Sequence, residues 1–317
     1  MKINIGIIGY GNLGKAVERI ILSNPSYNLV AIFSRRTITS PFKTLIEPLE
    51  NILIYKKKID VMLMCGGSFS DIEIQAPEIA KNFNTINSFD THSKIPTLHS
   101  KLNKICKENK TISIMSCGWD PGIFSIIRAM FYAITKNEPT TFWGKGISMG
   151  HSDAIRQVEG VDDGVEFTIP NIEKVKQARN ANLTEKSNLH FRECFVNCKK
   201  EHQAKVEYAI KNIPNYFKGE KTIVNFVSGI ELLKIKQKLM HKGEVMSHII
   251  HTNHEKSSLE FRVKMSSNPD FTASVMTAYI QAIVKLSKTK SYGSFTCLDI
   301  PISFLFNNYD KLIQKFC

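Results

Sequence analysis

Short apolar runs alternate with one amphipathic stretch at the start of the chain. Residues 3–8 form an apolar run that is too short for a helix and ends at a glycine, which predicts a buried strand. Apolar residues then recur at the spacing of one helical face, at Leu13, Ala16, Val17, Ile20 and Ile21. A turn signal at residues 23–25 ends this helix, and residues 29–33 form a second apolar run. This order predicts a βαβ unit.

The hydrophobic pattern changes further along the chain. Residues 59–64, 84–88 and 111–116 are further apolar runs, which predicts additional buried parallel strands. Residues 189–197, 222–227, 245–251 and 259–265 instead alternate, as strands with one exposed face do, and residues 202–213 have helical spacing. Residues 273–287 predict one helix that packs back on the first part. The expected fold class is α/β, a Rossmann-type domain plus a second, α+β domain.

A glycine motif lies at the first strand-to-helix turn. It reads Gly9-Tyr10-Gly11-Asn12-Leu13-Gly14 and fits G-x-G-x-x-G in the βαβ context that makes this motif informative. Gly9 permits the tight turn, Gly11 leaves room for a pyrophosphate, and Gly14 allows close packing of helix on sheet. The motif predicts a dinucleotide whose phosphates bind the helix N-terminus.

The end of the second predicted strand indicates which dinucleotide binds. An enzyme that prefers NAD carries an acidic residue there, to bind the ribose 2′-hydroxyl. Residues 33–40 contain no acid and present Ser34-Arg35-Arg36 instead. Two guanidinium groups and a hydroxyl suit a 2′-phosphate, which favours NADP. The alternative is that both arginines are only solvated surface residues.

Small, polar and acidic residues follow three of the predicted strands. In open α/β sheets, ligands bind beyond the carboxyl ends of the strands. The residues expected to line the cofactor there are Gly66, Gly67, Ser68, Phe69, Phe89, Asp90, Thr91, Cys117, Gly118, Trp119, Asp120, Pro121 and Gly122. Asp90 and Asp120 should project into one cleft beside the nicotinamide, although each could instead serve as a helix cap or turn residue.

The composition removes several classes of protein. The 317 residues are 43% hydrophobic, which excludes a disordered chain, and no run of about 18 apolar residues exists to span a membrane. The first residues lack the shape of a signal peptide, so a cytoplasmic location is expected. The formal charge of +13 comes from 34 scattered Lys and only 8 Arg. Nucleic-acid surfaces more often concentrate arginines with aromatic residues, so no nucleic-acid partner is expected.

Cysteines and histidines give no metal motif. The seven cysteines show no paired C-x-x-C spacing, which fits thiols in a reducing compartment. Cys194 and Cys198 lie in a predicted strand, too far apart to form a disulfide. His248, His251 and His254 have odd spacings that place neighbours on opposite faces of a strand, so no metal site is expected.

Several longer sequence motifs identify a family. They are Gly9 to Gly14, Phe33-Ser34-Arg35-Arg36, Gln75-Ala76-Pro77, Gly118-Trp119-Asp120-Pro121-Gly122, the stretch from Phe142 to Ala154, and the stretch from Asn268 to Ser274. Together they closely resemble the meso-diaminopimelate dehydrogenases. The resemblance implies NADP-dependent reductive amination of L-2-amino-6-oxopimelate to meso-2,6-diaminopimelate, a precursor of lysine and of the cell wall, by a homodimer. It also implies a discontinuous layout, with residues 1–118 and 270–317 binding NADP and residues 119–269 binding substrate and forming the dimer.

The resemblance also assigns residues to the substrate. Asp90 and Asp120 hold the reacting amino group, where electrostatics favours carboxylates beside an ammonium. The other residues expected to bind or enclose the substrate are Trp119, Trp143, Met149, Gly150, Asp153, Thr168, Arg192, His241 and Asn268. Thr168, Arg192, His241 and Asn268 would hold the far carboxylate. The general base is not assigned; a water held by Asp120 is one option.

Alternatives remain open for several of these residues. Arg192 could pair with an internal acid, His241 could be a surface residue, and both tryptophans could be core residues. Asp153 could line the site or cap a following helix. Met149 stands where some family members have Gln, and Thr91 where some have Asn.

Three other functions compete with the expected one. They are an NADP-dependent dehydrogenase of another or broader range of D-amino acids, which the flexible and apolar Met149 would suit, a non-catalytic NADPH sensor, and a nucleic-acid-binding protein suggested only by the charge.

Overall fold

The computed structural model describes residues 2–237, 240–251, 253 and 255–317, except for the side chains of residues 69 and 70. Contacts divide the chain into one unit of Met1–Ser125 with Pro269–Cys317 and a second unit of Ile126–Asn268. Residues 119–125 therefore lie in the first unit, whereas the expected boundary fell before them.

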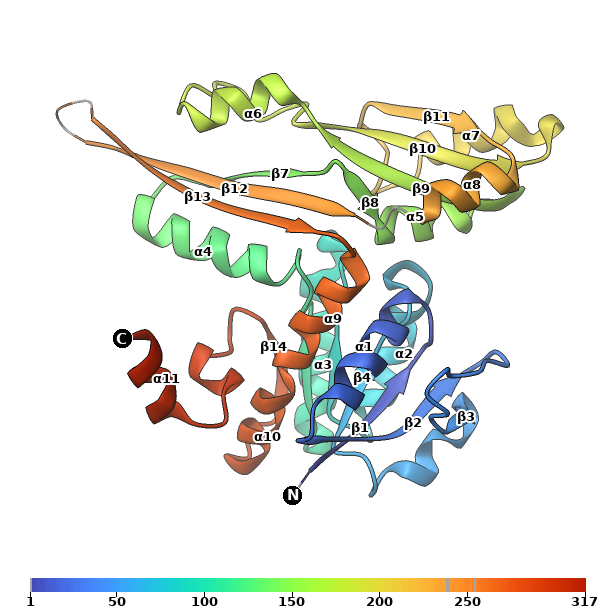
Figure 1. Cartoon of the computed structure of the whole chain (residues 1–317), viewed down its shortest axis with the longest axis vertical. Helices are drawn as coiled ribbons and strands as arrows, with labels where there is room; N and C mark the ends of the chain where they lie inside the picture. The colour runs from blue at the N-terminus through green and yellow to red at the C-terminus, as the bar shows by residue number, and fades with distance from the viewer. Residues whose placement is uncertain (1, 238–239, 252, 254) are drawn as a thin grey trace. The chain divides into compact units, whose positions relative to one another are not determined.

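A seven-stranded parallel sheet forms the centre of the first unit. Its strand order is β14-β6-β5-β4-β1-β2-β3, so the first six strands have the order of a doubly wound dinucleotide-binding sheet (Figure 1). The strands are β1 (Ile3–Ile8), β2 (Tyr27–Ser34), β3 (Ile46–Pro48), β4 (Val61–Met64), β5 (Thr85–Asn87), β6 (Ile112–Met115) and β14 (Gly293–Thr296). All the apolar runs predicted as strands in this part are confirmed, and the short strands β3 and β14 had not been predicted.

The helices of this unit pack apolar residues against the sheet, except the last one, Tyr309–Phe316, in which no residue is buried. They are α1 (Asn12–Ser23), α2 (Glu73–Ala80), α3 (Ile95–Asn109), α9 (Asn268–Ala278), α10 (Ile280–Lys288) and α11 (Tyr309–Phe316), with the short turns η1 (Leu49–Tyr55), η2 (Ser68–Ile72), η3 (His92–Lys94) and η5 (Ile302–Leu305). Ala76 of α2 and Leu98 and Leu102 of α3 pack in one buried cluster with Phe33 and Met64 of the sheet. Burial of this apolar surface is the main source of stability for the unit.

The single helix expected over residues 273–287 is wrong in its extent. The helix begins earlier, at Asn268, and is broken at Tyr279 into α9 and α10. The Thr277 hydroxyl donates to the Ala273 and Ser274 carbonyls, a type of bond that bends helices just before such a break.

The second unit contains two sheets. The first has the order β11-β10-β9-β8 and the second the order β13-β12-β7. The strands are β7 (Thr140–Trp143), β8 (Gly146–Ser148), β9 (Val161–Pro170), β10 (His190–Cys198), β11 (Thr222–Phe226), β12 (His241–Ile250) and β13 (Lys256–Met265). The helices are α4 (Ile123–Thr135), which begins in the first unit, α5 (Met149–Arg156), α6 (Ile172–Arg179), α7 (Gln203–Lys211) and α8 (Gly229–Lys236), with the short turn η4 (Lys200–His202).

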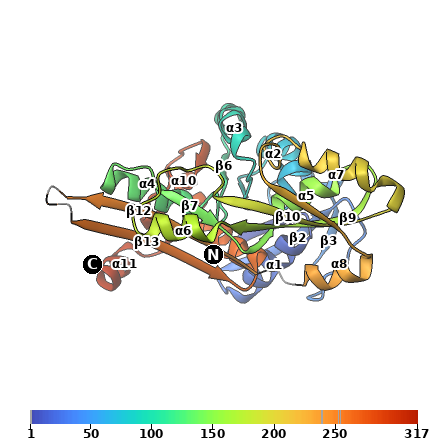
Figure 2. The same cartoon turned by 90° about the horizontal axis from the view of Figure 1, so that it is seen from above.

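Alternation along β10 explains how the helices sit on the first of these sheets. Cys194 and Val196 point into a cluster with α5 and α7, whereas Phe195 points toward Leu232 of α8. Figure 2 shows α7 and α8 on opposite sides of β9 and β10. In the second unit as a whole, the four expected strands (β10, β11, β12 and β13) and the expected helix α7 are confirmed. The strands β7, β8 and β9 had not been predicted.

Candidate active site

The glycine turn after β1 has the geometry that its motif requires. Gly9 has a φ of +87°, and a Cβ on Gly14 would lie 2.2 Å from the Gly9 carbonyl oxygen. A Cβ on Gly11 would meet nothing within 4 Å, so this position is open to a ligand. Gly11 is also the N-cap of α1 and provides no side-chain cap, which leaves the first N–H groups of the helix for an anion. The turn therefore fits a dinucleotide pyrophosphate.

A buried glutamate that the sequence did not single out supports this turn. Glu18 of α1 is fully buried and accepts hydrogen bonds from the hydroxyls of Tyr10, Ser40 and Thr44. The Tyr10 ring is therefore buried, and the loop that follows β2 is tied to α1. Only the fold brings these hydroxyls together, because Ser40 and Thr44 lie more than 20 residues beyond Glu18.

Arg35 and Arg36 lie at the end of β2 and are exposed. The Ser34 hydroxyl donates to the Arg36 carbonyl at 2.9 Å and accepts from the Arg36 N–H at 3.0 Å, which fixes this turn. The Arg35 guanidinium forms an ion pair with Asp71, which the sequence analysis did not name. Asp71 also accepts from the Gly67 N–H at 3.2 Å, so the ends of β2 and β4 are linked.

The ends of β4, β5 and β6 lie side by side, as expected for parallel strands. The Asp90 N–H donates to the Ser68 hydroxyl at 3.2 Å, and a Cβ on Gly118 would lie 3.6 Å from the Ser88 Cβ. Asp90 lies two residues after Ser88, and Asp120 lies two residues after Gly118. Phe89, Thr91 and Cys117 are buried, and burial raises the pKa of the Cys117 thiol, so Cys117 is a poor nucleophile. The Phe69 side chain lies outside the described residues.

Asp120 sits in a tight loop. The Gly118 N–H donates to the Pro121 carbonyl at 2.8 Å, and Gly122 has a φ of +141° with no room for a Cβ. The Trp119 ring meets Phe124 edge-on at 5.1 Å and stays partly exposed, so it is only in part a core residue. The loop therefore fixes the backbone that carries the Asp120 side chain.

Within the second unit, the expected substrate residues Thr168, Arg192 and His241 come together around Gly146, which had not been predicted as a site residue. Gly146, Thr168 and Arg192 are paired in register across β8, β9 and β10, so they share one face of the sheet. A Cβ on Gly146 would lie 2.5 Å from the Cγ of His241, so the imidazole packs directly on this glycine. His241 is buried, and the alternative of a surface histidine is wrong. Asn268 is also buried, and its amide donates to the Ile147 carbonyl at 3.3 Å.

Arg192 is a buried cation with an internal partner and an unused donor. Its Nη1 donates to the Thr168 hydroxyl at 2.7 Å and lies 3.5 Å from a carboxylate oxygen of Glu166. Arg192 therefore pairs with an internal acid, which was one of the two interpretations that its sequence left open. The Arg192 Nε is buried and has no hydrogen-bond partner among the described residues; the Glu220 carboxylate lies 4.0 Å from it. Because a buried unpaired donor is costly, this fork suits a further anion.

Trp143 is positioned by a histidine that the sequence analysis missed. The backbone N–H of Trp143 donates to the Nε2 of His190 at 2.7 Å, and the centroids of the two rings lie 4.9 Å apart. Burial, with the nearby charge of Arg192, lowers the pKa of His190 to about 3, so the ring is neutral and can accept this bond. No sequence signal distinguished His190 from an ordinary strand residue.

Helix α5 corrects one expectation. Ser148 is its N-cap, so Asp153 lies within the helix and is not a cap; it pairs with Arg156 at 3.4 Å. Met149 and Gly150 begin the helix. The Met149 side chain packs against the apolar cluster of Ile147 and Phe167, so it is at least partly a structural residue.

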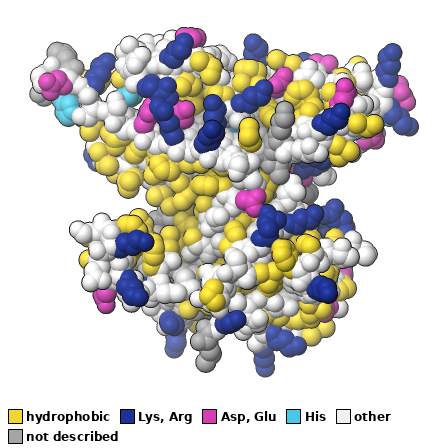
Figure 3. All heavy atoms as spheres, viewed as in Figure 1, with side chains coloured by type: hydrophobic (Ala, Val, Ile, Leu, Met, Phe, Trp, Pro, Cys, Tyr) yellow, Lys and Arg dark blue, Asp and Glu magenta, His cyan; other side chains and the backbone are white. Residues whose placement is uncertain are grey.

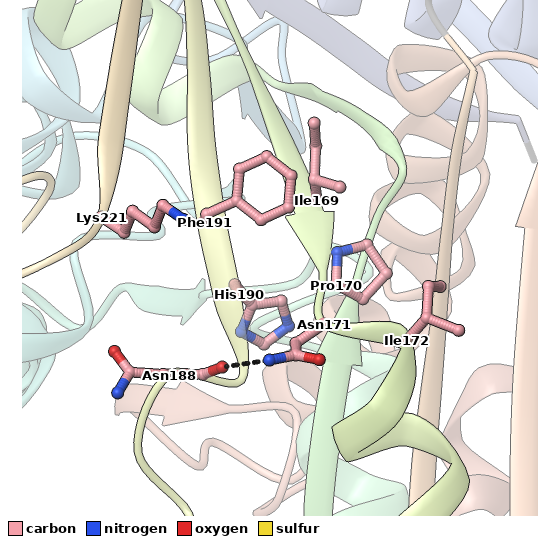
Figure 4. A pocket seen from close by; sticks show the side chains of 8 residues that line it. All are labelled: Ile169, Pro170, Asn171, Ile172, Asn188, His190, Phe191 and Lys221. Atoms are coloured by element: carbon pink, nitrogen blue, oxygen red, sulfur yellow. Dashed lines mark hydrogen bonds between the residues drawn. The ribbon is translucent and has the colours of Figure 1, made fainter.

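A cavity of about 690 Å³ opens beside His190 (Figure 4). Its lining residues are Ile169, Pro170, Asn171, Ile172, Asn188, His190, Phe191 and Lys221. None of the expected substrate residues is among them, although His190 contacts Trp143, and Ile169 and Phe191 are chain neighbours of Thr168 and Arg192. This cavity is therefore not the site that the sequence analysis described.

Metal binding and membrane insertion find no support among the described residues. That part of the chain has no group of three or more His, Cys, Asp or Glu side chains suited to a metal. His248 and His251 contact Ser258 and Ser257 of β13, and His254 lies outside the described residues. No described helix combines the length and apolar character that a bilayer span needs. Cys194 and Cys198 are both free thiols on β10.

The parallel sheet with its glycine turn, joined to an α+β unit that carries a buried arginine, defines the class of dehydrogenases that use a nicotinamide dinucleotide. Residues 118–267 match the family described as Diaminopimelic acid dehydrogenase C-terminal domain. A meso-diaminopimelate D-dehydrogenase of Ureibacillus thermosphaericus is 42% identical over 96% of this chain and 95% of its own length. The corresponding protein of Corynebacterium glutamicum is 35% identical over 99% of both chains.

Solved structures agree with these relatives. A Corynebacterium glutamicum DAP dehydrogenase in complex with DAP has a TM-score of 0.94 at 33% identity, covering 100% of this chain and 99% of that one. An engineered D-amino acid dehydrogenase bound to NADP+ has a TM-score of 0.96 at 32% identity and covers both chains fully. The chain belongs to the meso-diaminopimelate dehydrogenase family, and the expected fold class is confirmed.

Proposed function

We propose that the chain is an NADP-dependent meso-2,6-diaminopimelate dehydrogenase. It converts the D-centre of meso-diaminopimelate to the oxo group of L-2-amino-6-oxopimelate and releases ammonium; the biosynthetic direction is the NADPH-dependent reductive amination, which serves lysine and peptidoglycan precursor synthesis. The observation that carries this proposal is the buried fork of Arg192 beside Thr168, with an Nε that no described residue satisfies. A buried cation with an unused donor suits the second carboxylate of a dicarboxylic substrate.

The first unit binds NADP, which when bound accepts or returns the hydride of the substrate α-carbon. The first N–H groups of α1 bind the pyrophosphate, and Gly11 leaves space for it. Ser34, Arg35 and Arg36 bind the 2′-phosphate. Arg35 is pre-oriented by Asp71, so the guanidinium needs little ordering when the phosphate arrives.

Replacing both arginines should remove the preference for the phosphorylated dinucleotide. The variant Arg35→Asp, Arg36→Leu should bind NADPH about 100-fold more weakly, since two charge-assisted contacts to a phosphate are lost at about 1.5 kcal/mol each. NADH affinity should change little. The measurement is fluorescence titration with NADPH and with NADH. An unchanged NADPH affinity would contradict the assignment of Arg35 and Arg36 to the 2′-phosphate.

The reacting end of the substrate is bound by Asp90 and Asp120, which attract the ammonium group. Arg192, Thr168, His241 and Asn268 bind the far carboxylate. Trp119, Trp143, Met149, Gly150 and Asp153 complete the expected contacts and exclude water. During oxidation the ammonium loses a proton before the imine reacts with water, and Asp120 or a water that it holds can take up this proton.

One assay tests the function. Purified protein with NADP should reduce the dinucleotide at alkaline pH when given meso-diaminopimelate, but not with the L,L or D,D isomers, as read from NADPH absorbance. Turnover of simple D-amino acids at comparable rates would favour the broader dehydrogenase instead. If no substrate is turned over but NADPH binds tightly, the result would favour the non-catalytic NADPH sensor.

We also propose a cytoplasmic homodimer. Helix α4 packs on the sheet β13-β12-β7 of its own unit, where Thr135 and Ser247 are 2.8 Å apart. The opposite face of α4 leaves Met130, Tyr132 and Ile134 about half exposed, and Figure 3 shows apolar side chains gathered over this helix. Such a face suits a second copy of the chain. Sedimentation equilibrium should give twice the monomer mass, and a monomer at all concentrations would contradict the proposal.

A further inference from the structure

Glu166 is a fully buried carboxylate on β9, next to the residues assigned to the far carboxylate of the substrate. The Thr168 hydroxyl donates to the Glu166 Oε1 at 3.0 Å and accepts from the Arg192 Nη1 at 2.7 Å. The same Oε1 lies 3.5 Å from that Nη1. The three side chains form one buried polar cluster, Glu166–Thr168–Arg192, on one face of the sheet.

The hydrogens in this cluster limit what it can bind. A threonine hydroxyl has one proton to donate and two lone pairs. While Glu166 is a carboxylate, the Thr168 proton points to Glu166, so Thr168 has no donor left for a second anion. If Glu166 carries a proton, Glu166 donates to Thr168, and the Thr168 proton becomes available to an incoming carboxylate.

The charges in the cluster lead to the same conclusion. Arg192 and Glu166 already balance each other inside the buried cluster, because the second carboxylate near Arg192, that of Glu220, lies 4.0 Å from the Nε and is 44% exposed to water. A substrate carboxylate on Arg192 would place two anions on one buried cation, and an uncompensated buried charge is unfavourable. A proton on Glu166 restores a one-to-one balance.

We propose that Glu166 is a positioning residue that takes up a proton when the far carboxylate of the substrate binds Arg192, and thereby turns the Thr168 hydroxyl toward that carboxylate. This inference rests on the proposed function, since it assumes that Arg192 binds the substrate.

The surroundings of Glu166 are consistent with this role. Burial raises the pKa of Glu166 to about 7, an effect that Arg192 and Thr168 only partly oppose. The ionisable groups on the elements packed around it are Arg192 and Cys194 on β10, Glu220 before β11, and His151, Asp153 and Arg156 on α5. Arg156 pairs with Asp153, and His151 contacts Ser148 at 2.9 Å. Burial raises the pKa of the Cys194 thiol, which therefore stays neutral.

Calorimetry can count the proton directly. Meso-diaminopimelate is titrated into the protein–NADPH complex, which cannot turn over, in buffers of different ionisation enthalpy. At about pH 8, wild type should take up close to one proton per site, and the affinity should fall as pH rises, by at most about tenfold per pH unit. Glu166→Gln mimics the protonated acid, because its amide N–H can donate to Thr168. It should show no proton uptake and a nearly flat affinity.

Two further variants keep the test decisive. Glu193→Gln removes a neighbouring carboxylate on the other face of β10, which pairs with Lys145, and should retain the wild-type uptake. Thr168→Val keeps Glu166 but lacks the hydroxyl that opposes its raised pKa, so it should show a smaller uptake at the same pH and bind meso-diaminopimelate about tenfold more weakly. Uptake that persists in folded Glu166→Gln, or is absent from an active wild type, would overturn the proposal. A wild type that neither binds nor oxidises meso-diaminopimelate would instead overturn the proposed function, and this inference with it.

Discussion

An Arg192→Met variant should oxidise meso-diaminopimelate with a KM raised at least about 30-fold, because losing one partner of a buried charge pair costs about 2–5 kcal/mol. The side chain of Arg192 is only 11% exposed, and its Nη1 already holds Thr168 in place. Met fills a similar volume without a donor, so the far carboxylate would have no cation to bind. NADPH binding should be unchanged, since the residues assigned to NADP lie in the other unit.

The effect of this change on the fold should be small. Glu166 would lose its cation, but burial already raises its pKa, so the residue can become neutral instead of remaining an unpaired charge. Initial rates at varied meso-diaminopimelate give KM, and fluorescence gives the dissociation constant of NADPH. Arg262→Met is the matched control, because Arg262 is half exposed on β13 and pairs with Glu260 and Glu244 at the surface. A joint loss of substrate and NADPH affinity would indicate misfolding, and an unchanged KM would contradict the role of Arg192.

The parts of the fold that the sequence predicted well are those with a strong local signal. The unit from β1 to β2 combines two short apolar runs, a helical stripe and a glycine turn, and its boundaries agree with the structure within about two residues. The same holds for β4, β5 and β6, which are buried on both faces and so form continuous apolar runs.

The central strand β9 shows why other elements were missed. Its sequence begins Val-Asp-Asp-Gly and places Glu166 and Thr168 at inward positions, where an alternating strand would be apolar. Those two polar residues are buried because Arg192, on the neighbouring strand, provides their partner. The pattern that hides the strand is therefore the same feature that makes it a candidate binding surface.

Partners of the site residues were missed for a related reason. Glu18, Asp71 and His190 are ordinary residues in their local sequence, and each acquires its role only from a contact with a residue far along the chain. Asp71 reaches Arg35 across 36 positions, and His190 reaches Trp143 across 47. Motifs mark residues that contact a ligand, whereas the residues that support them are defined by tertiary structure.

The net charge of +13 says little about function until the positions of the charged residues in the fold are known. Most ion pairs of the described residues are surface contacts such as Lys205 with Glu159, which contribute little to stability. Arg192 differs because it is buried and its partners are incomplete. The position of one arginine therefore says more about function than the sum of all the lysines.

An Asp120→Asn variant should lose about 10²- to 10⁴-fold in kcat, the range expected when a positioned carboxylate is removed from proton transfer. Asn has the same shape and can still accept a hydrogen bond, but it lacks the negative charge that favours the developing cationic imine and that holds the water or proton beside it. The loop that carries Asp120 should keep its structure, because backbone hydrogen bonds from Gly118 to Pro121 and from Ile123 to Gly118 hold it. KM should therefore change much less than kcat.

The measurement is the steady-state rate of NADPH formation with saturating meso-diaminopimelate, supported by thermal unfolding of the variant. Asp310→Asn is the matched control, since Asp310 is exposed in the first turn of α11 and should leave kcat as in wild type. A kcat within about threefold of wild type would exclude Asp120 from the chemistry, since the smallest usual contribution of such a group is about 100-fold. Asp90 would then be the other carboxylate assigned to the ammonium group, and Asp90→Asn should show the loss instead.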